Sequence, residues 1–296
     1  MLLNKNIPVA YILKKIRLEL VIVFIIGVVV YFLTHLAERV IPPMPIQIPA
    51  FLGTAISVIL SFKLNQSYDR WWEARKIWGS IVNDSRNLVL QLQSFLSGSN
   101  DDIRKITLRQ IAWCFSLGQS LRGQDPMARL EGHLTADELV PITEHNNKPL
   151  AILQLNAQHI ADLRRDGKLD IFSHVQINST MIGLTNSMGM AERIKSTVFP
   201  VTYRLFLRLF IYLFVITLSI SLSDVAIYYE IPLLLVISSV FFLLERTATH
   251  LQDPFENRPT DTAMTAIATT IETNLKQLIN DKNIPKSKPV EQYYLI

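Results

Sequence analysis

The chain has 296 residues, of which 49% are hydrophobic and only 18% are charged. Soluble domains typically carry about 25% charged residues, so this composition favours a membrane protein over a soluble enzyme. The formal net charge of +4 is mild, and basic residues flanking membrane helices explain it better than nucleic-acid binding does. Cys114 is the single cysteine, which excludes an intrachain disulfide.

Four apolar stretches indicate membrane-spanning helices, since a helix needs about 20 apolar residues to cross roughly 30 Å of hydrocarbon. They cover residues 18–37, 46–64, 205–222 and 231–244, and the last one extends back to Tyr228. Prolines in the segment 38–45 end the first helix. Arg208 lies near one end of the third stretch, from where its side chain is expected to reach the headgroups.

The segment after residue 64 turns polar but keeps a helical periodicity. Apolar residues recur at Trp71, Trp78, Val82 and Val89, so we expect the second helix to continue out of the membrane. The break comes at residues 98–100.

Further helices are predicted in the polar middle of the chain and after the last span. Asp101 and Asp102 place carboxylates at the positive end of one helix, and Thr135 is a cap for a short one. Residues 149–165 and 169–190 form two more helices. Asp261 is expected to cap a final amphipathic helix that runs to about Ile279.

These elements divide the chain into five segments: 1–17, an N-terminal segment; 18–64, the first two spans; 65–204, a helical domain; 205–246, the last two spans; and 247–296, a loop, a helix and a polar tail. The two turns between paired spans contain only Arg39 among Lys and Arg, whereas the other flanks are basic. The positive-inside rule therefore predicts a multi-pass protein with both termini and the helical domain in the cytoplasm. No small-residue cleavage site follows the first apolar run, so we expect no removable signal peptide.

The sequence offers no motif for catalysis, metal binding or cofactor binding. It lacks GxSxG, a Walker loop and GxGxxG, and its six histidines show no metal-ligand spacing. We therefore predict that the chain is not an enzyme, needs no cofactor and holds no metal. The run RWWEAR at residues 70–75 lies directly after a span, so packing at the membrane interface explains it better than nucleic-acid binding.

Three residues of the second span share one helical face, because Thr54, Val58 and Phe62 are four residues apart. Ordinary helix packing or lipid contact would explain such a stripe. If several subunits placed it around one axis, the stripe would instead form stacked rings, and a narrow apolar ring resists water and ions until it widens. Periodicity does not choose between these readings, since Ile59 and Leu60 are equally apolar.

The segment FKLNQSYDRWWEARKIWG closely resembles the pattern FRTNxxYDRWWEARxxWG of the bacterial bestrophin family. The segments ERIKSTVFPVTY and LQDPFENRPTD, before the third span and after the fourth, are similar to two further family segments. The resemblance covers nearly the whole chain, with the segments in the family's order.

This resemblance implies an all-α membrane protein that forms a bestrophin-like homopentamer in the bacterial inner membrane, in contact with lipid. Each subunit would contribute four transmembrane helices and a large cytosolic helical region, with one ion pore along the fivefold axis. Counting from the matched Arg70 places a hydrophobic pore neck at Thr54, Val58 and Phe62. Counting from the matched Pro200 places a cytosolic aperture near Phe172.

Three departures from the family pattern stand out. Lys63 replaces the usual arginine after the neck, and Thr54 is polar where a large apolar residue is expected, which would leave the neck wider there. The calcium clasp of eukaryotic members uses a run of acidic residues after the DPF motif. Here Arg258 and Pro259 interrupt that run. Because calcium needs six to eight oxygen ligands, we predict no tight calcium site.

The resemblance leaves the sign of the permeant ion open, because hydrophobic rings carry no net charge. Bacterial relatives are associated with monovalent cations, which favours cations, whereas the alternative is a chloride or anion channel like animal bestrophins. A non-conducting membrane scaffold is the main hypothesis of another class. A secondary transporter is disfavoured, because we find neither repeats nor buried ionisable residues at mid-span.

Overall fold

The computed structural model describes residues 9–36, 44–96, 98–197, 200–223 and 225–285. Within these residues every regular element is a helix. The chain divides into two compact units. Of the described residues, unit 1 contains 71–197 and 253–285, and unit 2 contains 9–70 and 200–252. The predicted polar tail extends beyond residue 285 and so lies partly outside the described residues.

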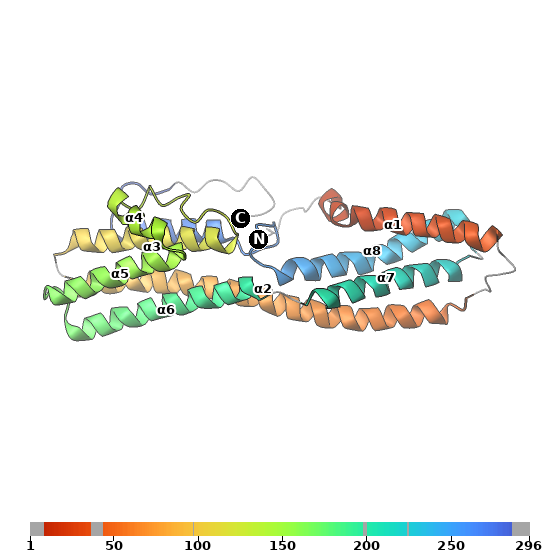
Figure 1. Cartoon of the computed structure of the whole chain (residues 1–296), viewed down its shortest axis with the longest axis horizontal. Coiled ribbons are helices and arrows are strands. Elements are labelled where there is room, and N and C mark those ends of the chain that lie inside the picture. The colour runs from red at the N-terminus through yellow and green to blue at the C-terminus, as the bar shows by residue number, and fades with distance from the viewer. Residues whose placement is uncertain (1–8, 37–43, 97, 198–199, 224, 286–296) are drawn as a thin grey trace. The chain divides into compact units, whose positions relative to one another are not determined.

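Unit 2 holds the four helices that are long and apolar enough to cross a membrane. They are α1 (Val9–Leu36), the first part of α2 (Gln47–Phe95), α7 (Val201–Ser221) and α8 (Ile227–Gln252), which run alongside one another in Figure 1. Each of the four predicted spans thus corresponds to one candidate membrane helix. Two of these helices are longer than their apolar stretches, since α1 starts at Val9 and α8 continues past Leu244 to Gln252.

Helix α2 is continuous over 49 residues, as the periodicity predicts, and supplies residues to both units. It ends at Phe95, and Gly98 follows with a φ of 77°, a left-handed conformation that glycine adopts without strain. One helix therefore carries both the apolar stripe of the second span and the tryptophan-rich segment after it.

Unit 1 is a bundle formed by the second part of α2 together with α3 (Asn100–Leu121), α4 (Ala136–Glu144), α5 (Lys148–Arg165), α6 (Ile171–Ser196) and α9 (Met264–Leu278). Its core contains two tryptophans, Trp78 of α2 and Trp113 of α3, which are both fully buried. Figure 1 shows α3, α5 and α6 side by side in this unit. The hydrophobic effect of these large side chains fixes α2 in the bundle.

Two helix starts predicted in the middle of the chain are confirmed, the helix predicted over 169–190 instead covers Ile171–Ser196, and one predicted cap is wrong. Asp101 and Asp102 lie in the first turn of α3, and Thr135 caps α4, with its backbone N–H bonded to Glu138. Asp261, however, does not cap α9, which begins only at Met264. Its carboxylate accepts the backbone N–H of Arg258 at 2.9 Å and so closes the loop before the helix.

Candidate functional site: the exposed face of the second span

Thr54, Val58 and Phe62 all lie on one exposed face of α2 in unit 2. Val58 is 52% exposed and Phe62 is 65% exposed. The opposite face packs into the core of the unit through Ile56 and Leu60. The structure thus separates the stripe from its equally apolar neighbours, which periodicity alone could not do. It leaves the stripe free to contact lipid, another subunit or a pore.

The exposed face of α2 carries no carboxylate along the span. The sequence from Gln47 to Tyr68 contains neither Asp nor Glu, and its one charged residue, Lys63, is buried. The Thr54 hydroxyl donates to the carbonyl of Ala50 at 2.9 Å, as hydroxyls on apolar helices often do. The face therefore presents apolar side chains and small polar groups rather than fixed charge.

Helix α7 holds the neighbouring surface of α2 by close contact. A Cβ atom placed on Gly53 would lie 3.1 Å from the ring of Phe214, so the two helices approach closely at this level. Further along, the Tyr203 hydroxyl contacts the carbonyl oxygen of Ile59 at 3.3 Å. These contacts lie on either side of Val58 along the helix and fix the spacing of α2 from α7.

A charged cluster lies at one end of the spans in unit 2. The ammonium of Lys63 contacts Glu245 Oε1 at 3.1 Å and the Thr249 hydroxyl oxygen at 3.0 Å. That hydroxyl donates in turn to Glu245 Oε1 at 2.9 Å, which closes a three-membered network between α2 and α8. Lys63 and Glu245 are 0% and 1% exposed, respectively. Water is therefore excluded from the pair.

Two more ion pairs tie the remaining spans to this cluster. Arg208 of α7 places its guanidinium 3.6 Å from Glu245 Oε2, so this side chain pairs with a carboxylate. Arg246 of α8 donates to Glu19 of α1 at 2.6 Å. All four spanning helices of unit 2 are therefore joined by charged groups.

The sequence alone does not reveal this cluster, because Lys63 simply replaces the family's usual arginine and Glu245 lies one residue beyond the apolar stretch 231–244. The sequence does contain part of the evidence for this cluster. A lysine inside an otherwise uncharged apolar run needs a partner, and ionisable residues in membrane segments usually face the bundle interior. Its partner could not be identified, since Glu245 is 182 residues away in the sequence.

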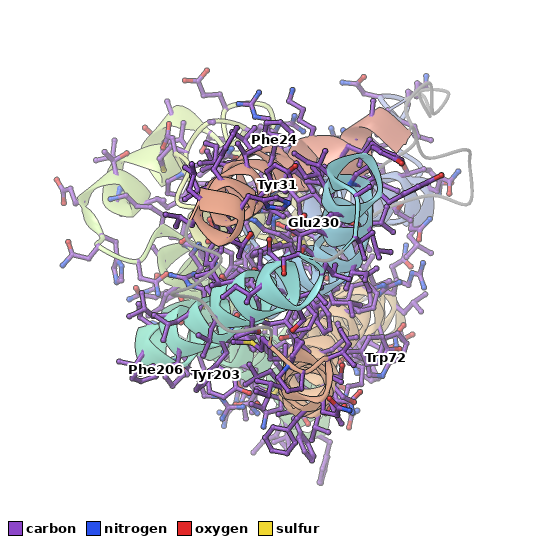
Figure 2. All side chains as sticks on the ribbon, turned by 90° about the vertical axis from the view of Figure 1, so that its right-hand side faces the viewer. Phe24, Tyr31, Trp72, Tyr203, Phe206 and Glu230 are labelled. Atoms are coloured by element: carbon purple, nitrogen blue, oxygen red, sulfur yellow. The ribbon has the colours of Figure 1, made fainter. Side chains whose placement is uncertain are left out.

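Another buried carboxylate, Glu230, lies in the first turn of α8 and is fully inaccessible. Its Oε1 accepts the hydroxyl hydrogen of Ser219 at 3.0 Å. Figure 2 looks along the spanning helices and places Glu230 among them, with Phe206 at the rim. Lys63, Glu230 and Glu245 are therefore buried ionisable residues, and they lie at or just beyond the ends of the apolar stretches 46–64 and 231–244 rather than at mid-span.

Phe172, the predicted aperture residue, lies in the first turn of α6 in unit 1 and is 83% exposed. Asp170 caps this helix by accepting the backbone N–H groups of Phe172 and Ser173 at 2.8 and 3.1 Å. The cap fixes the backbone at this point, so the exposed ring projects from a rigid helix start. Ile171 beside it is also exposed.

Helix α6 is depleted of charge over most of its length. From Ile171 to Ala191 the sequence contains no Asp, Glu, Lys or Arg. Its exposed positions nevertheless include Phe172, Val175 and Ile182, together with small polar residues. A helix face that is exposed to water is normally rich in charged residues, so this face is unusual for a free surface.

The loop between α8 and α9 is held by contacts within the protein. Glu256 pairs with Lys195 of α6 at 2.6 Å, and this hydrogen bond lowers the pKa of the Glu256 carboxyl. Burial raises the pKa of Asp261, although the Arg258 backbone N–H partly offsets the effect. Among the described residues, no group of three or more His, Cys, Asp or Glu side chains is arranged to hold a metal ion.

Comparison with known proteins supports the resemblance noted in the sequence. The family described as Bacterial/Fungal Bestrophin protein matches residues 7–277. The chain is 31% identical to the voltage-dependent anion channel-forming protein YneE of Escherichia coli K12, over 96% of this chain and 93% of that protein. It is 25% identical to voltage-dependent chloride channel 1 of Arabidopsis thaliana chloroplasts, over 85% of this chain and 60% of that protein.

A solved structure has the same fold. The crystal structure of a bacterial bestrophin homologue from Klebsiella pneumoniae matches with a TM-score of 0.85 at 29% identity, covering 90% of this chain and 98% of that one. The match to a channel-forming family places the chain among channel proteins and not among enzymes. The chain therefore belongs to the bacterial bestrophin family and is a multi-pass membrane protein of this channel family.

Proposed function

We propose that the chain forms a homopentameric channel of the bacterial inner membrane that conducts monovalent anions. The observation that carries the proposal is the near full-length similarity to proteins named anion channel-forming. It supports the anion alternative over the cation preference that we inferred from the family resemblance. The spanning helices of unit 2 provide the membrane part that such a channel needs.

The neck of this channel would be formed by rings of Thr54, Val58 and Phe62. Exposure of all three on one face of α2 supports the assignment, because a pore-lining side chain must leave the core of its own subunit. In a five-membered ring, Val58 and Phe62 would form an apolar constriction that water enters reluctantly. Thr54 would leave the neck wider and wetter at its own level.

The absence of acidic groups on this face agrees with anion conduction. Cation channels commonly concentrate cations with rings of Asp or Glu, whereas the span from Gln47 to Tyr68 contains neither. Apolar rings do not select a sign, so the neck alone would act as a gate. Selectivity would then depend on the potential along the rest of the pathway.

Phe172 would form a second constriction in the cytosolic part of the pathway. Its 83% exposure and its place at the capped start of α6 support this role, since the ring is presented without contacts that hold it in the subunit core. Both termini and unit 1 would lie in the cytoplasm, as the basic flanks of the spans indicate.

Chloride efflux from proteoliposomes tests the proposal. Vesicles that contain the purified protein and are loaded with potassium chloride should release chloride once valinomycin lets potassium leave with it. A mass measurement of the protein in detergent should give five copies of the chain. Chloride efflux no faster than from protein-free vesicles would overturn anion conduction and would leave a cation channel or the non-conducting scaffold. A different copy number with normal efflux would overturn only the pentamer.

A further inference from the structure

The proposed pore does not use the buried ion pair between Lys63 of α2 and Glu245 of α8. Lys63 follows Phe62 directly, and consecutive residues of a helix point about 100° apart. Phe62 is exposed, whereas the Lys63 ammonium is enclosed by Glu245 and Thr249 of α8. The side chain of Lys63 thus points away from the proposed pore and into unit 2.

A buried charge is a strong positional constraint. Removal of an ammonium from water is costly unless an opposite charge and further hydrogen bonds replace the solvent. Here the carboxylate of Glu245 supplies the charge and the Thr249 hydroxyl supplies a second acceptor. If α2 turned by one residue about its axis, the ammonium would lose both partners, and Phe62 would leave the exposed face.

We propose that Lys63 is a positioning residue for the channel gate, which holds α2 against α8 in the rotation that presents Val58 and Phe62 to the pore. This inference rests on the proposed function, because it assigns to the Lys63–Glu245–Thr249 contact a role in gating that neck. Lys63 does not touch the permeant ion in this account. It therefore controls how often the neck opens, and it does not determine which ion passes.

Four variants separate this role from general stability. Lys63→Met keeps most of the side-chain volume but removes the charge, and Lys63→Arg restores a cation. Glu245→Gln removes the charge of the partner. Arg246→Met is the matched control, since it breaks an ion pair between α8 and α1, with Glu19, in the same unit.

Single-channel recording gives the first readout. We expect Lys63→Met and Glu245→Gln to raise the open probability at least threefold, with an unchanged reversal potential. Lys63→Arg should restore values within twofold of the native protein, and Arg246→Met should not alter gating. If the native protein conducts and Lys63→Met has the same open probability, the positioning role of Lys63 is contradicted. The proposed channel function is then unaffected.

Combination with the neck variants tests whether Lys63 acts through the rings. In the Val58→Ala, Phe62→Ala background the apolar constriction is removed, so Lys63→Met should change the open probability by less than 1.5-fold. A threefold rise in open probability in this background would show that the ion pair affects a part of the channel other than the neck.

Thiol labelling gives a readout that does not depend on current. Ser67 lies four residues after Lys63, on the same side of α2, and is buried. Cys114 is the only native cysteine; it is fully buried, and burial raises the pKa of its thiol to about 12. A Ser67→Cys substitution therefore adds one labelling site to a protein whose native thiol reacts slowly with maleimide.

We expect maleimide labelling of Ser67→Cys to be at least fivefold faster when combined with Lys63→Met, and unchanged when combined with Arg246→Met. Equal labelling in all three proteins would show that α2 keeps its rotation without the ion pair and would overturn the inference. This result stands even if the native protein carries no current, in which case the proposed channel function fails separately.

Discussion

The ring of Phe214 on α7 lies so close to Gly53 on α2 that a Cβ atom at Gly53 would come within 3.1 Å of it. Phe214 belongs to the buried core of unit 2, where Ile56 and Leu60 of α2 also pack. Small residues at helix crossings allow close packing in membranes, where dispersion contacts rather than the hydrophobic effect hold helices together. Gly53 therefore sets the approach of the neck helix to α7.

Replacement of Gly53 by leucine is expected to destabilise unit 2, because the larger side chain overpacks the contact with Phe214. Overpacking typically costs about 1–3 kcal/mol. The apparent midpoint of heat-induced aggregation in detergent should fall by several degrees. Gly189→Ala is the control, since a Cβ there meets nothing within 4 Å, and alanine should leave the midpoint unchanged or raise it. Equal midpoints for Gly53→Leu and the native protein would mean that the contact between α2 and α7 has room for a larger side chain.

Shortening the rings of the neck should raise the current. Phe62→Ala and Val58→Ala each remove apolar volume from the proposed constriction, which then wets more easily. We expect the unitary conductance or the open probability to rise several-fold in planar bilayers. Phe24→Ala is a suitable control, because Phe24 is a similarly exposed phenylalanine on α1. A loss of current in a correctly folded Phe62→Ala protein, or the same rise in Phe24→Ala, would count against a hydrophobic gate at this level.

Asp102 links α3 to the end of α5 in unit 1. Its carboxylate contacts His159 Nε2 and the Lys168 ammonium, both at 3.1 Å. Arg109 can only donate, so its contact of 3.0 Å makes His159 Nδ1 the acceptor and Nε2 the N–H that donates to Asp102. Partial burial opposes the ionisation of Asp102, but these hydrogen bonds outweigh it and hold its pKa below the usual value.

Acid should therefore weaken unit 1. A folded pKa below the unfolded value of about 3.9 means that the stabilisation by Asp102 is fully present above that pH and is lost as the pH falls through the folded pKa. Asp102→Asn should increase hydrogen exchange in α3 and α5 at pH 7, with the difference from the native protein shrinking by pH 3. A difference that stays constant across this range would show that the charge of Asp102 contributes nothing.

Calcium removal is expected to leave the channel unchanged. The loop after α8 contains three carboxylates, and two of them already have partners, since Glu256 pairs with Lys195 and Asp261 accepts the Arg258 N–H. Too few free oxygens remain for six to eight calcium ligands. Currents recorded in EGTA and in millimolar calcium should agree within error. A reversible change between these solutions would reveal a calcium site that the loop geometry does not suggest.

The helices were predictable because local signals determine them. Apolar runs of sufficient length locate the spans, and polar residues with a helical period extend α2 to Phe95. Asp261 shows the limit of such signals. Aspartate is a common cap, but its carboxylate here closes a loop turn instead, and the choice depends on where the neighbouring Arg258 N–H lies.

The contacts between distant segments could not be predicted. Nothing near Lys63 in the sequence indicates that its ammonium lies against Glu245, 182 residues later, because only the packing of α2 on α8 brings them together. The stripe of Thr54, Val58 and Phe62 was found by spacing, yet its exposure required the folded subunit. Its role as a pore neck remains a prediction, since it depends on the neighbouring subunits.

The reversal potential under a sodium chloride gradient tests the central claim most directly. Purified protein in a planar bilayer, with tenfold more salt on one side, should give a reversal potential close to the chloride equilibrium potential. That value should persist in Val58→Ala, which changes the gate but adds no charge. A reversal potential close to the sodium equilibrium potential would contradict the account and make this bestrophin a cation channel.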